Sequence, residues 1–574
     1  MLHYKIYKDE SGEEVVEIDT DGMELLHNPI LNKGTAFTTE ERKLFRIDGY
    51  LPPAVSTLDQ QVDRRYEGFS GKNTDLEKYI YLRSLEDRNE TLFYSLLLKH
   101  LGEMIPIVYT PTVGLACQMF SHIFRFTRGV FLSPENISQI DDIFQSLPYR
   151  NIEMIVATDS EGILGLGDQG VGGMGIPVGK LSLYTGGAGI HPANCLPVTL
   201  DVGTNNEELL NDPLYLGIRK NRIRGEEYLS FVDKFVLGVK KNFPDAVLQW
   251  EDFSKQNAFT LLDKYRDEVP SFNDDIQGTG AVVLAGIKGA VRVAGTDLID
   301  QAFAILGAGA GGIGVARQIH RGLVADGLTQ EEARQRIYVL DSRGVVHEGR
   351  KGVDEYKKEF SREKEFAQGW TLEGADQITL LDLARNAGIT VLIGLSGVAS
   401  SFSEDVVSAM AKNAERPIIF PLSNPTAFTE AAPEDIYRWT EGKAIVATGS
   451  PFPDVKFGDK SFTVGQGNNV FIFPGVGLGA LTVRASVITD DMITAAARRL
   501  SEIIPQGNLD INCVYPYPAQ LREVCREIAF AVAEKAMEQG VAQKPVEQEH
   551  LEDRIHSRMW VPEYARYTRG AESV

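Results

Sequence analysis

The segment from residue 302 to residue 341 limits the possible folds of this chain more than any other. A short apolar run, AFAIL, leads into Gly307-Ala-Gly309-Ala-Gly-Gly312, a helical stretch follows, and the next apolar run, RIYVLD, ends in Asp341. Such glycines let a pyrophosphate approach the N-terminus of a helix, and the acid suits a ribose hydroxyl. The segment predicts a Rossmann-type dinucleotide-binding unit; the alternative is a glycine-rich turn in a domain that binds nothing.

A second GxGxxG match, Gly165-Leu-Gly167-Asp-Gln-Gly170, lies earlier in the chain. Pro177 stands a few residues beyond it, where the helix of a dinucleotide-binding unit should be running. Proline disrupts helix interiors, so this match has poor surroundings. The later turn is therefore the expected dinucleotide site.

The residues after the second strand of this unit leave the choice between NAD and NADP open. Asp341 favours a free 2′-hydroxyl, as in NAD. Ser342 and Arg343 follow it directly, and Lys357 and Lys358 come soon after. These cations could hold the 2′-phosphate of NADP, or they could form a solvated basic patch.

The length and the alternation of apolar runs predict more than one domain. A chain of 574 residues exceeds one ordinary core. Up to about residue 130 the sequence is mainly helical in pattern, and TLFYSLLLKHLGEMI (91–105) predicts an apolar helix that ends before Pro106. From about residue 150 short β-rich runs alternate with helical stretches, most regularly after about residue 300. This alternation predicts an α/β fold with a parallel sheet covered on both faces.

Charge and cysteine usage exclude several classes of partner. Lys and Arg number 58 and Asp and Glu number 80, a net charge of −22 that repels nucleic acid and anionic lipid. The four cysteines are scattered without CxxC spacing, which suits a reducing compartment. The longest uncharged apolar run (302–316) is shorter than the roughly 20 residues of a membrane-spanning helix. We expect a cytoplasmic protein with no nucleic-acid partner and no membrane contact.

Two pairs of acidic residues suggest a metal site. Glu251-Asp252 follows the β-run AVLQW, and Asp274-Asp275 lies in SFNDDIQGTG. Adjacent carboxylates are costly to place together unless a cation neutralises them, and an all-oxygen set of Glu251, Asp252 and Asp275 suits Mg2+ or Mn2+. Each pair alone is more often a solvated turn or a helix cap. The hypothesis depends on both pairs falling at the ends of apolar strands.

Lys180 lies in the apolar, glycine-rich segment GMGIPVGKL. A P-loop is excluded, because Met174 replaces the first glycine of that motif and Leu181 the serine or threonine. A lysine in such surroundings is a candidate general base. The alternative is a side chain that extends to the surface.

Long motifs occur at intervals from residue 31 to residue 475: LNKGTAFTTEERKLFRIDGYLPP (31–53), IPIVYTPTVG (105–114), GILGLGDQGVGGMGIPVGKLSLYT (162–185), LDVGTNN (200–206), QWEDFSKQNAF (249–259), FNDDIQGTG (272–280), PLSNPT (421–426), TGSPF (448–452) and GQGNNVFIFPG (465–475). In these stretches the chain resembles the malic enzymes, and the resemblance extends over nearly its whole length. It implies oxidative decarboxylation of malate to pyruvate and CO2, with NAD or NADP and with Mg2+ or Mn2+.

The resemblance also implies a role for each matching position. Lys180 would be the general base on the malate hydroxyl, partnered by Asp274, and Tyr109 the acid that protonates the enolate carbon. Asn424 and Asn469 would bind the substrate carboxylates. The implied metal ligands are Glu251, Asp252 and Asp275. The implied cofactor-binding residues are Gly307, Gly309, Gly312, Asp341, Ser342, Arg343 and Asn424.

The domain organisation implied by the family is split. We expect a catalytic α/β domain plus a Rossmann-type dinucleotide-binding domain, with a helical N-terminal region. The expected boundaries are 1–130 for the N-terminal region, 131–277 and 467–540 for the catalytic domain, 278–466 for the dinucleotide domain and 541–574 for a C-terminal helical tail. Family members are usually dimers or tetramers, so a homodimer or homotetramer is expected, with the tail packing on a neighbouring subunit.

One departure from the family pattern keeps other functions open. Many malic enzymes have a substrate-binding arginine in G-E-R-I-L-G, where this chain has Gly162. Gly162→Arg should lower the KM for malate if that cation is simply missing. Malolactic enzymes, which convert malate to lactate with bound NAD, share the E-G-I-L-G form. A metal-independent amino-acid dehydrogenase and a non-catalytic nucleotide-binding regulator are further alternatives.

Overall fold

The structure, a computed structural model, describes residues 4–8, 14–163, 165–363, 365–374 and 377–570. The chain forms two compact units that are each discontinuous in sequence. The first unit comprises 1–160, 169–246 and 557–574, and the second comprises 161–168 and 247–556.

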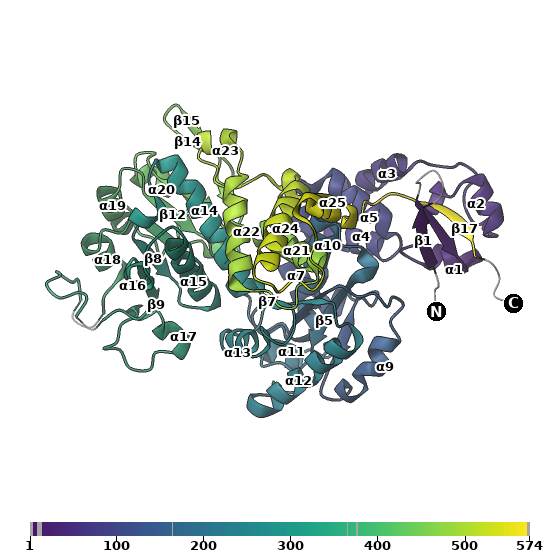
Figure 1. The fold of residues 1–574 in the computed structure, drawn as a ribbon, viewed down its shortest axis with the longest axis horizontal. Helices are drawn as coiled ribbons and strands as arrows, with labels where there is room; N and C mark the ends of the chain where they lie inside the picture. The colour runs from purple at the N-terminus through teal and green to yellow at the C-terminus, as the bar shows by residue number, and fades with distance from the viewer. Residues whose placement is uncertain (1–3, 9–13, 164, 364, 375–376, 571–574) are drawn as a thin grey trace. The chain divides into compact units, whose positions relative to one another are not determined.

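The two ends of the chain meet in one small sheet of the first unit (Figure 1). Strand β1 (Tyr4–Lys8) pairs antiparallel with β2 (Glu14–Ile18), and β17 (Arg566–Arg569) pairs parallel with β2. Tyr567, from the middle of β17, is buried with Phe37 and Phe45. The tail beyond residue 540, which we expected to be helical, is helical only in part. It contains helix α25 (Gln548–Arg558), and strand β17 follows and pairs with β2 of the same chain.

Helices dominate the rest of the first 130 residues, as the sequence predicts. Threonine side chains begin several of them with capping boxes, which satisfy the first backbone N–H groups. The principal helices are α1 (Gly22–His27), α2 (Thr39–Leu44), α3 (Leu58–Ser70), α4 (Asp75–Glu86), α5 (Glu90–Lys99), α6 (Leu101–Val108), α7 (Thr112–Gln118) and α8 (Phe120–Ile123).

The expected single helix over 91–105 is wrong in two respects. The chain breaks at His100, which separates α5 from α6, and Pro106 lies inside α6. Proline removes one backbone donor, whose acceptor would be the carbonyl of Gly102 four residues earlier. Gly102 is exposed, so its carbonyl can bond to water instead.

The remaining part of the first unit is α/β. Strand β5 (Cys195–Leu200) pairs parallel with β3 (Val130–Leu132) and with β4 (Met154–Thr158). Helix α10 (Gly175–Ala188) is buried over its whole length, which its glycines and apolar residues permit. The other helices here are α9 (Ile140–Gln145), α11 (Glu207–Asn211) and α12 (Gly225–Asn242).

The second unit contains the expected parallel sheet. Its order is β10-β9-β8-β11-β12-β13-β16, and only β10 is antiparallel to its neighbour. The strands are β8 (Phe303–Leu306), β9 (Ile337–Asp341), β10 (Gly344–Val345), β11 (Val391–Gly394), β12 (Ile418–Pro421), β13 (Ile445–Thr448) and β16 (Gly465–Gln466). The helices around the strands include α15 (Ala310–Ala325), α16 (Gln330–Gln335), α18 (Leu380–Asn386), α19 (Glu404–Asn413) and α20 (Pro433–Trp439).

A second pair of parallel strands and a set of long helices complete this unit. Strand β6 (Val247–Trp250) pairs with β7 (Ser271–Asn273), with Trp250 opposite Asn273. The helices are α13 (Lys255–Tyr265), α14 (Thr279–Ala294), α21 (Phe473–Val483), α22 (Asp490–Glu502), α23 (Gln506–Asp510) and α24 (Leu521–Glu538). Strands β14 (Val455–Phe457) and β15 (Lys460–Phe462) form a hairpin.

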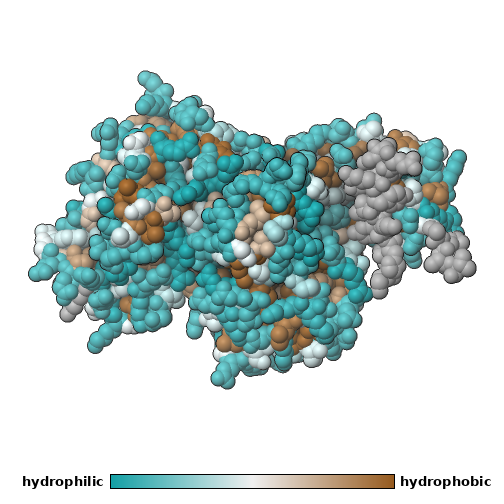
Figure 2. Space-filling model, in the orientation of Figure 1, coloured by the Kyte–Doolittle hydropathy of each residue, from teal (hydrophilic) through white to brown (hydrophobic). Residues whose placement is uncertain are grey.

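The surface is largely polar on the face that is drawn. The face drawn in Figure 2 is mostly hydrophilic, with hydrophobic residues in small separate groups. Three of the four cysteines are buried: Cys117, Cys513 and Cys525. Within the part of the chain that the structure describes, every helix is too short or too polar to traverse a bilayer.

Candidate active site

Three carboxylates converge where β6 and β7 end. Glu251, Asp252 and Asp275 each offer an oxygen atom, and these atoms all lie within 4.8 Å of one another. Since β6 and β7 are adjacent and parallel, their carboxyl ends bring the two acidic pairs together. Three buried or half-buried carboxylates form a hard, all-oxygen donor set, which fits Mg2+ or Mn2+.

The backbone around Asp252 holds this set in place. Asp252 has a φ of +55°, a conformation uncommon outside glycine, and its backbone N–H donates to Asp275 Oδ2 at 2.8 Å. Glu251 Oε2 accepts from the Gln249 side chain at 2.7 Å. Glu251 and Asp252 are only 2% and 5% exposed. Hydrogen bonds from other protein groups, rather than from solvent, therefore hold these carboxylates in position.

Asp274 faces a different group from its neighbour Asp275. The side-chain amide of Asn469 donates to Asp274 Oδ2 at 3.0 Å and to Thr279 Oγ1 at 3.0 Å. A Cβ added at Gly278 would lie 1.9 Å from Asp274 Oδ1, so only glycine leaves room for this carboxylate. In this structure Asn469, expected to bind substrate, contacts Asp274.

Lys180 and Tyr109 lie close together in the first unit. Lys180 Nζ is 5.2 Å from the centre of the Tyr109 ring, and the two residues are 1% and 5% exposed. Lys180 does not extend to the surface, the alternative left open by the sequence. A Cβ added at Gly179 would lie 2.8 Å from the carbonyl oxygen of Val108, so glycine permits α10 to approach the end of α6.

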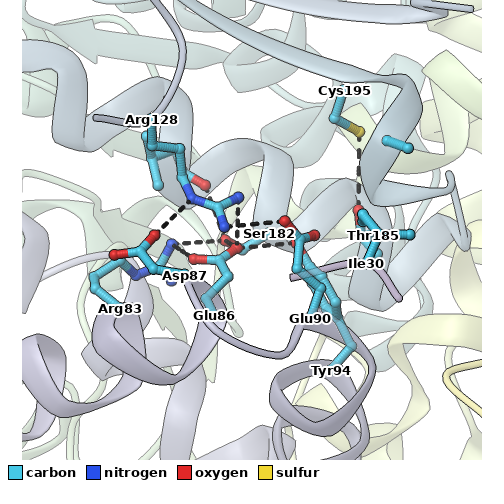
Figure 3. Close-up of polar contacts among 12 residues, drawn as sticks. Ile30, Arg83, Glu86, Asp87, Glu90, Tyr94, Arg128, Ser182, Thr185 and Cys195 are labelled. Carbon is cyan, nitrogen blue, oxygen red and sulfur yellow. Dashed lines mark hydrogen bonds and ion pairs between the residues drawn. The ribbon is translucent and has the colours of Figure 1, made fainter. Parts of the chain in front are cut away.

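A buried ionic network links α10 to the helices before it (Figure 3). Arg83 pairs with Glu86 at 2.5 Å, and Arg83 Nη1 also donates to Ser182 Oγ at 3.0 Å. Ser182 lies two residues after Lys180 on α10. Arg128 pairs with Glu86 at 3.4 Å and with Glu90 at 3.1 Å. The network fixes α4, α5 and α10 relative to one another within the first unit.

The glycine-rich turn of the second unit has the geometry of a dinucleotide site. It connects β8 to α15, and Gly307 has a φ of +119°. A Cβ added at Gly312 would lie 1.7 Å from the Gly307 carbonyl oxygen. Gly309 is the N-cap residue of α15, whose first N–H groups are those that bind anions in such units.

Asp341 lies at the end of β9 beside several cations. Arg350 donates to both oxygens of Asp341, at 2.7 and 2.8 Å, and Lys357 Nζ lies 3.3 Å away. Partial burial raises the pKa of Asp341. The hydrogen bonds from the Arg343 N–H and the Arg350 guanidinium lower this pKa by a larger amount, so the net shift is downward. The Arg343 side chain instead donates to the carbonyl groups of residues 351 and 352. Ser342 follows Asp341 directly.

Asn424 follows β12 and is exposed. Its Oδ1 accepts from Ser450 Oγ at 2.5 Å. A Cβ added at Gly449 would lie 2.9 Å from Asn424 Nδ2, so the two loops are in close contact. The side chain is oriented by the loop after β13, while part of it remains available to a ligand.

Gly162 has no room for the arginine of the family pattern. Its N–H donates to the Asp252 carbonyl at 2.9 Å, and a Cβ added there would lie 2.7 Å from the Phe253 carbonyl oxygen. A larger residue would push the backbone that carries Asp252. Because of this packing, we expect Gly162→Arg to impair malate binding rather than to improve it.

Sequence reasoning missed two residues that shape these groups, Gln249 and Arg350, which were not among the expected site residues. Gln249 lies in β6 and Glu251 directly follows that strand, so the period-2 alternation of the strand, continued by one residue, places the two side chains on one face. Arg350 carries no such local signal, because it reaches Asp341 only after the chain has turned back through β10.

The parallel sheet with its glycine-rich turn, and the three carboxylates in the same unit, define a class of protein: an α/β oxidoreductase that takes up a dinucleotide. Residues 276–537 match the family profile described as "Malic enzyme, NAD binding domain", and residues 86–266 match "Malic enzyme, N-terminal domain". The chain belongs to the malic enzyme family.

Relatives of known name cover almost the whole chain. A protein of Pectobacterium carotovorum named NAD-dependent malic enzyme is 49% identical over 545 residues, 95% of this chain and 96% of its own. A protein of the same name from Aliivibrio fischeri is 46% identical over 550 residues, 96% of this chain and 98% of its own.

Solved structures share the fold. The malic enzyme of Entamoeba histolytica superposes with a TM-score of 0.56 at 24% identity, covering 90% of this chain and 91% of its own. That of Pyrococcus horikoshii Ot3 has a TM-score of 0.54 at 25% identity, covering 80% and 89%. Both agree with the expected α/β fold class.

Proposed function

We propose that this chain oxidatively decarboxylates malate to pyruvate and CO2, with NAD as the hydride acceptor and a divalent cation. The single observation that carries the proposal is the convergence of Glu251, Asp252 and Asp275 in a chain of this family. The near full-length relatives named NAD-dependent malic enzyme support the same activity and the choice of NAD.

The proposed binding groups follow from the donor chemistry. Glu251, Asp252 and Asp275 would hold Mg2+ or Mn2+. Gly307, Gly309 and Gly312 would receive the pyrophosphate at the start of α15, with Asp341, Ser342, Arg343 and Asn424 as further cofactor contacts. When bound, the cation would supply Lewis-acid polarisation of the substrate, and the nicotinamide would supply the hydride acceptor.

The protein's own groups would move the protons. Lys180 Nζ would take the proton of the malate 2-hydroxyl as hydride leaves C2, with Asp274 as its partner. After the bond from C3 to the departing CO2 breaks, Tyr109 would donate a proton to C3. The proton would return from Lys180 to Tyr109, whose ring centre lies 5.2 Å from Lys180 Nζ. Asn424 and Asn469 would orient the substrate carboxylates.

The test of the activity follows both possible products. The purified protein is incubated with malate, Mn2+ and NAD, and NADH, pyruvate and lactate are measured. We expect NADH and pyruvate in equal amounts and loss of both with EDTA. Lactate without accumulated NADH would establish the malolactic reaction instead, and activity that survives EDTA would favour a metal-independent dehydrogenase.

Cofactor preference is a separate measurement. Since Arg350 and Lys357 both contact Asp341, the carboxylate remains negative beside the expected ribose position. We expect kcat/KM to be higher with NAD than with NADP by at least about tenfold, the effect of about 1.4 kcal/mol. Equal kcat/KM values for NAD and NADP would show that Arg350 and Lys357 can leave Asp341 and bind a 2′-phosphate instead.

We also propose a cytoplasmic homodimer or homotetramer. The scattered cysteines and the acidic surface favour a reducing, aqueous compartment. Sedimentation equilibrium of the intact chain tests the assembly, and a monomer at micromolar concentration would refute it. Fractionation of the source cells tests the compartment.

A further inference from the structure

Glu430 is a fully buried carboxylate in the second unit, and its side chain joins two loops. It is 0% exposed. It accepts hydrogen bonds from the Ser396 N–H and Oγ, both at 2.9 Å, and from the Ser423 Oγ at 2.5 Å and N–H at 3.3 Å. One carboxylate thus receives four donors from two serines.

The geometry shows that the fold reserves space for this side chain. A Cβ added at Gly394 would lie 2.4 Å from Glu430 Cδ. The loops are also joined directly, because the Gly397 N–H donates to Ser423 Oγ at 2.9 Å. Burying a charge is costly unless strong hydrogen bonds replace its hydration. The four hydrogen bonds to Glu430 provide this replacement. All four can form only while both loops keep their present positions.

These two loops lie where a dinucleotide is expected. In the sheet order, β8 is flanked by β9 on one side and β11 on the other, so the strand order reverses between β8 and β11. Ligands of such sheets bind outside the carboxyl ends of the strands at this switch point. The loop that holds Ser396 directly follows β11. Its Leu395 carbonyl oxygen would lie 2.3 Å from a Cβ added at Gly307, so it is in contact with the glycine-rich turn.

The second loop leads to an expected ligand of substrate and cofactor. Ser423 directly precedes Asn424, which follows β12. Glu430 therefore acts on one loop that touches the glycine-rich turn and on another that presents Asn424. We propose that Glu430 is a positioning residue for the dinucleotide, which fixes the separation of these two loops without itself touching the ligand. This inference rests on the proposed use of NAD.

The experiment measures the binding of NADH alone, by its fluorescence, to the intact protein without malate. Glu430→Ala should raise the Kd for NADH about tenfold, equivalent to about 1.4 kcal/mol. Ser396→Ala removes one of the four donors and should raise the Kd about threefold. Glu430→Gln keeps one acceptor oxygen but places an amide against the Ser423 N–H, so its Kd should lie between that of the wild type and that of Glu430→Ala.

Asp382 provides a matched control in the same domain. It is also 0% exposed, and it accepts from the Thr379 N–H and Oγ at 2.9 and 2.8 Å and from the Glu373 N–H at 2.8 Å, at the start of α18. Asp382→Asn should lower the melting temperature but leave the Kd for NADH within about twofold of the wild type.

Each outcome decides the inference. Weaker NADH binding in the Glu430 and Ser396 variants, with Asp382→Asn unchanged, supports it. Unchanged binding in Glu430→Ala and Ser396→Ala, or an equal loss in Asp382→Asn, overturns it. If Glu430→Ala does not fold, Ser396→Ala and Glu430→Gln decide by the same criteria. Failure of the wild-type protein to bind NADH would instead refute the proposed cofactor.

Discussion

Replacing Glu90 with glutamine tests whether a buried charge limits the stability of the first unit at neutral pH. In the network of Figure 3, three carboxylates face two guanidinium groups: Glu86, Asp87 and Glu90 against Arg83 and Arg128. The charges balance only when one carboxylate holds a proton. Among the residues that the structure describes, none forms a hydrogen bond with Glu90 Oε2, so Glu90 is the group expected to hold the proton.

The magnitude follows from the pKa of Glu90. Burial raises it from 4.5 to about 7, an effect that Arg128 opposes and the Glu86 charge reinforces. The folded protein therefore binds the proton more tightly than the unfolded chain, and stability is lost as the pH rises from about 4.5 through about 7. A shift of this size corresponds to about 3 kcal/mol. Glutamine is neutral at every pH, so the variant lacks this loss.

Urea unfolding, followed by tryptophan fluorescence between about pH 5 and about pH 8, measures the difference. The free energy of unfolding of Glu90→Gln minus that of the wild type should rise by about 2.5 kcal/mol over this range, slightly less than the full effect because Glu90 of the unfolded chain has already lost most of its protons at pH 5. Asp382→Asn is the control, because hydrogen bonds from Thr379 and Glu373 lower the pKa of Asp382 against the opposing effect of its burial, and its difference should stay constant. A constant difference for Glu90→Gln as well would refute the reasoning.

Three further substitutions test the candidate site. Asp275→Asn should raise the Mn2+ concentration for half-maximal activity by about 100-fold, because it removes one of three charged ligands; an unchanged requirement would exclude it as a ligand. Gly312→Ala should weaken NADH binding at least about tenfold, because its Cβ would lie 1.7 Å from the Gly307 oxygen, while malate-independent Mn2+ binding is retained. Gly162→Arg should raise the KM for malate and weaken Mn2+ binding by displacing Asp252, and a lower KM would contradict the packing seen here.

Much of the fold and of the candidate site could be predicted because the signals are local in the sequence. The glycine-rich turn, the strand before it and the helix after it are contiguous, and a Cβ at Gly312 would meet the Gly307 carbonyl oxygen of the same turn. The acidic pairs directly follow β6 and β7, and parallel neighbours bring their carboxyl ends together. Alternating strands and helices predicted the parallel sheet for the same reason.

The tertiary structure decided what depends on residues far apart in the sequence. The pairing of β17 with β2 joins the two chain ends, and the Arg350 contact with Asp341 needs the turn through β10. The Phe253 carbonyl closes the space at Gly162, which no local pattern indicates. Glu430 meets donors from two separate loops after β11 and β12. Local patterns set backbone conformation and the face of each side chain, whereas space, burial and charge compensation arise only when distant segments pack together.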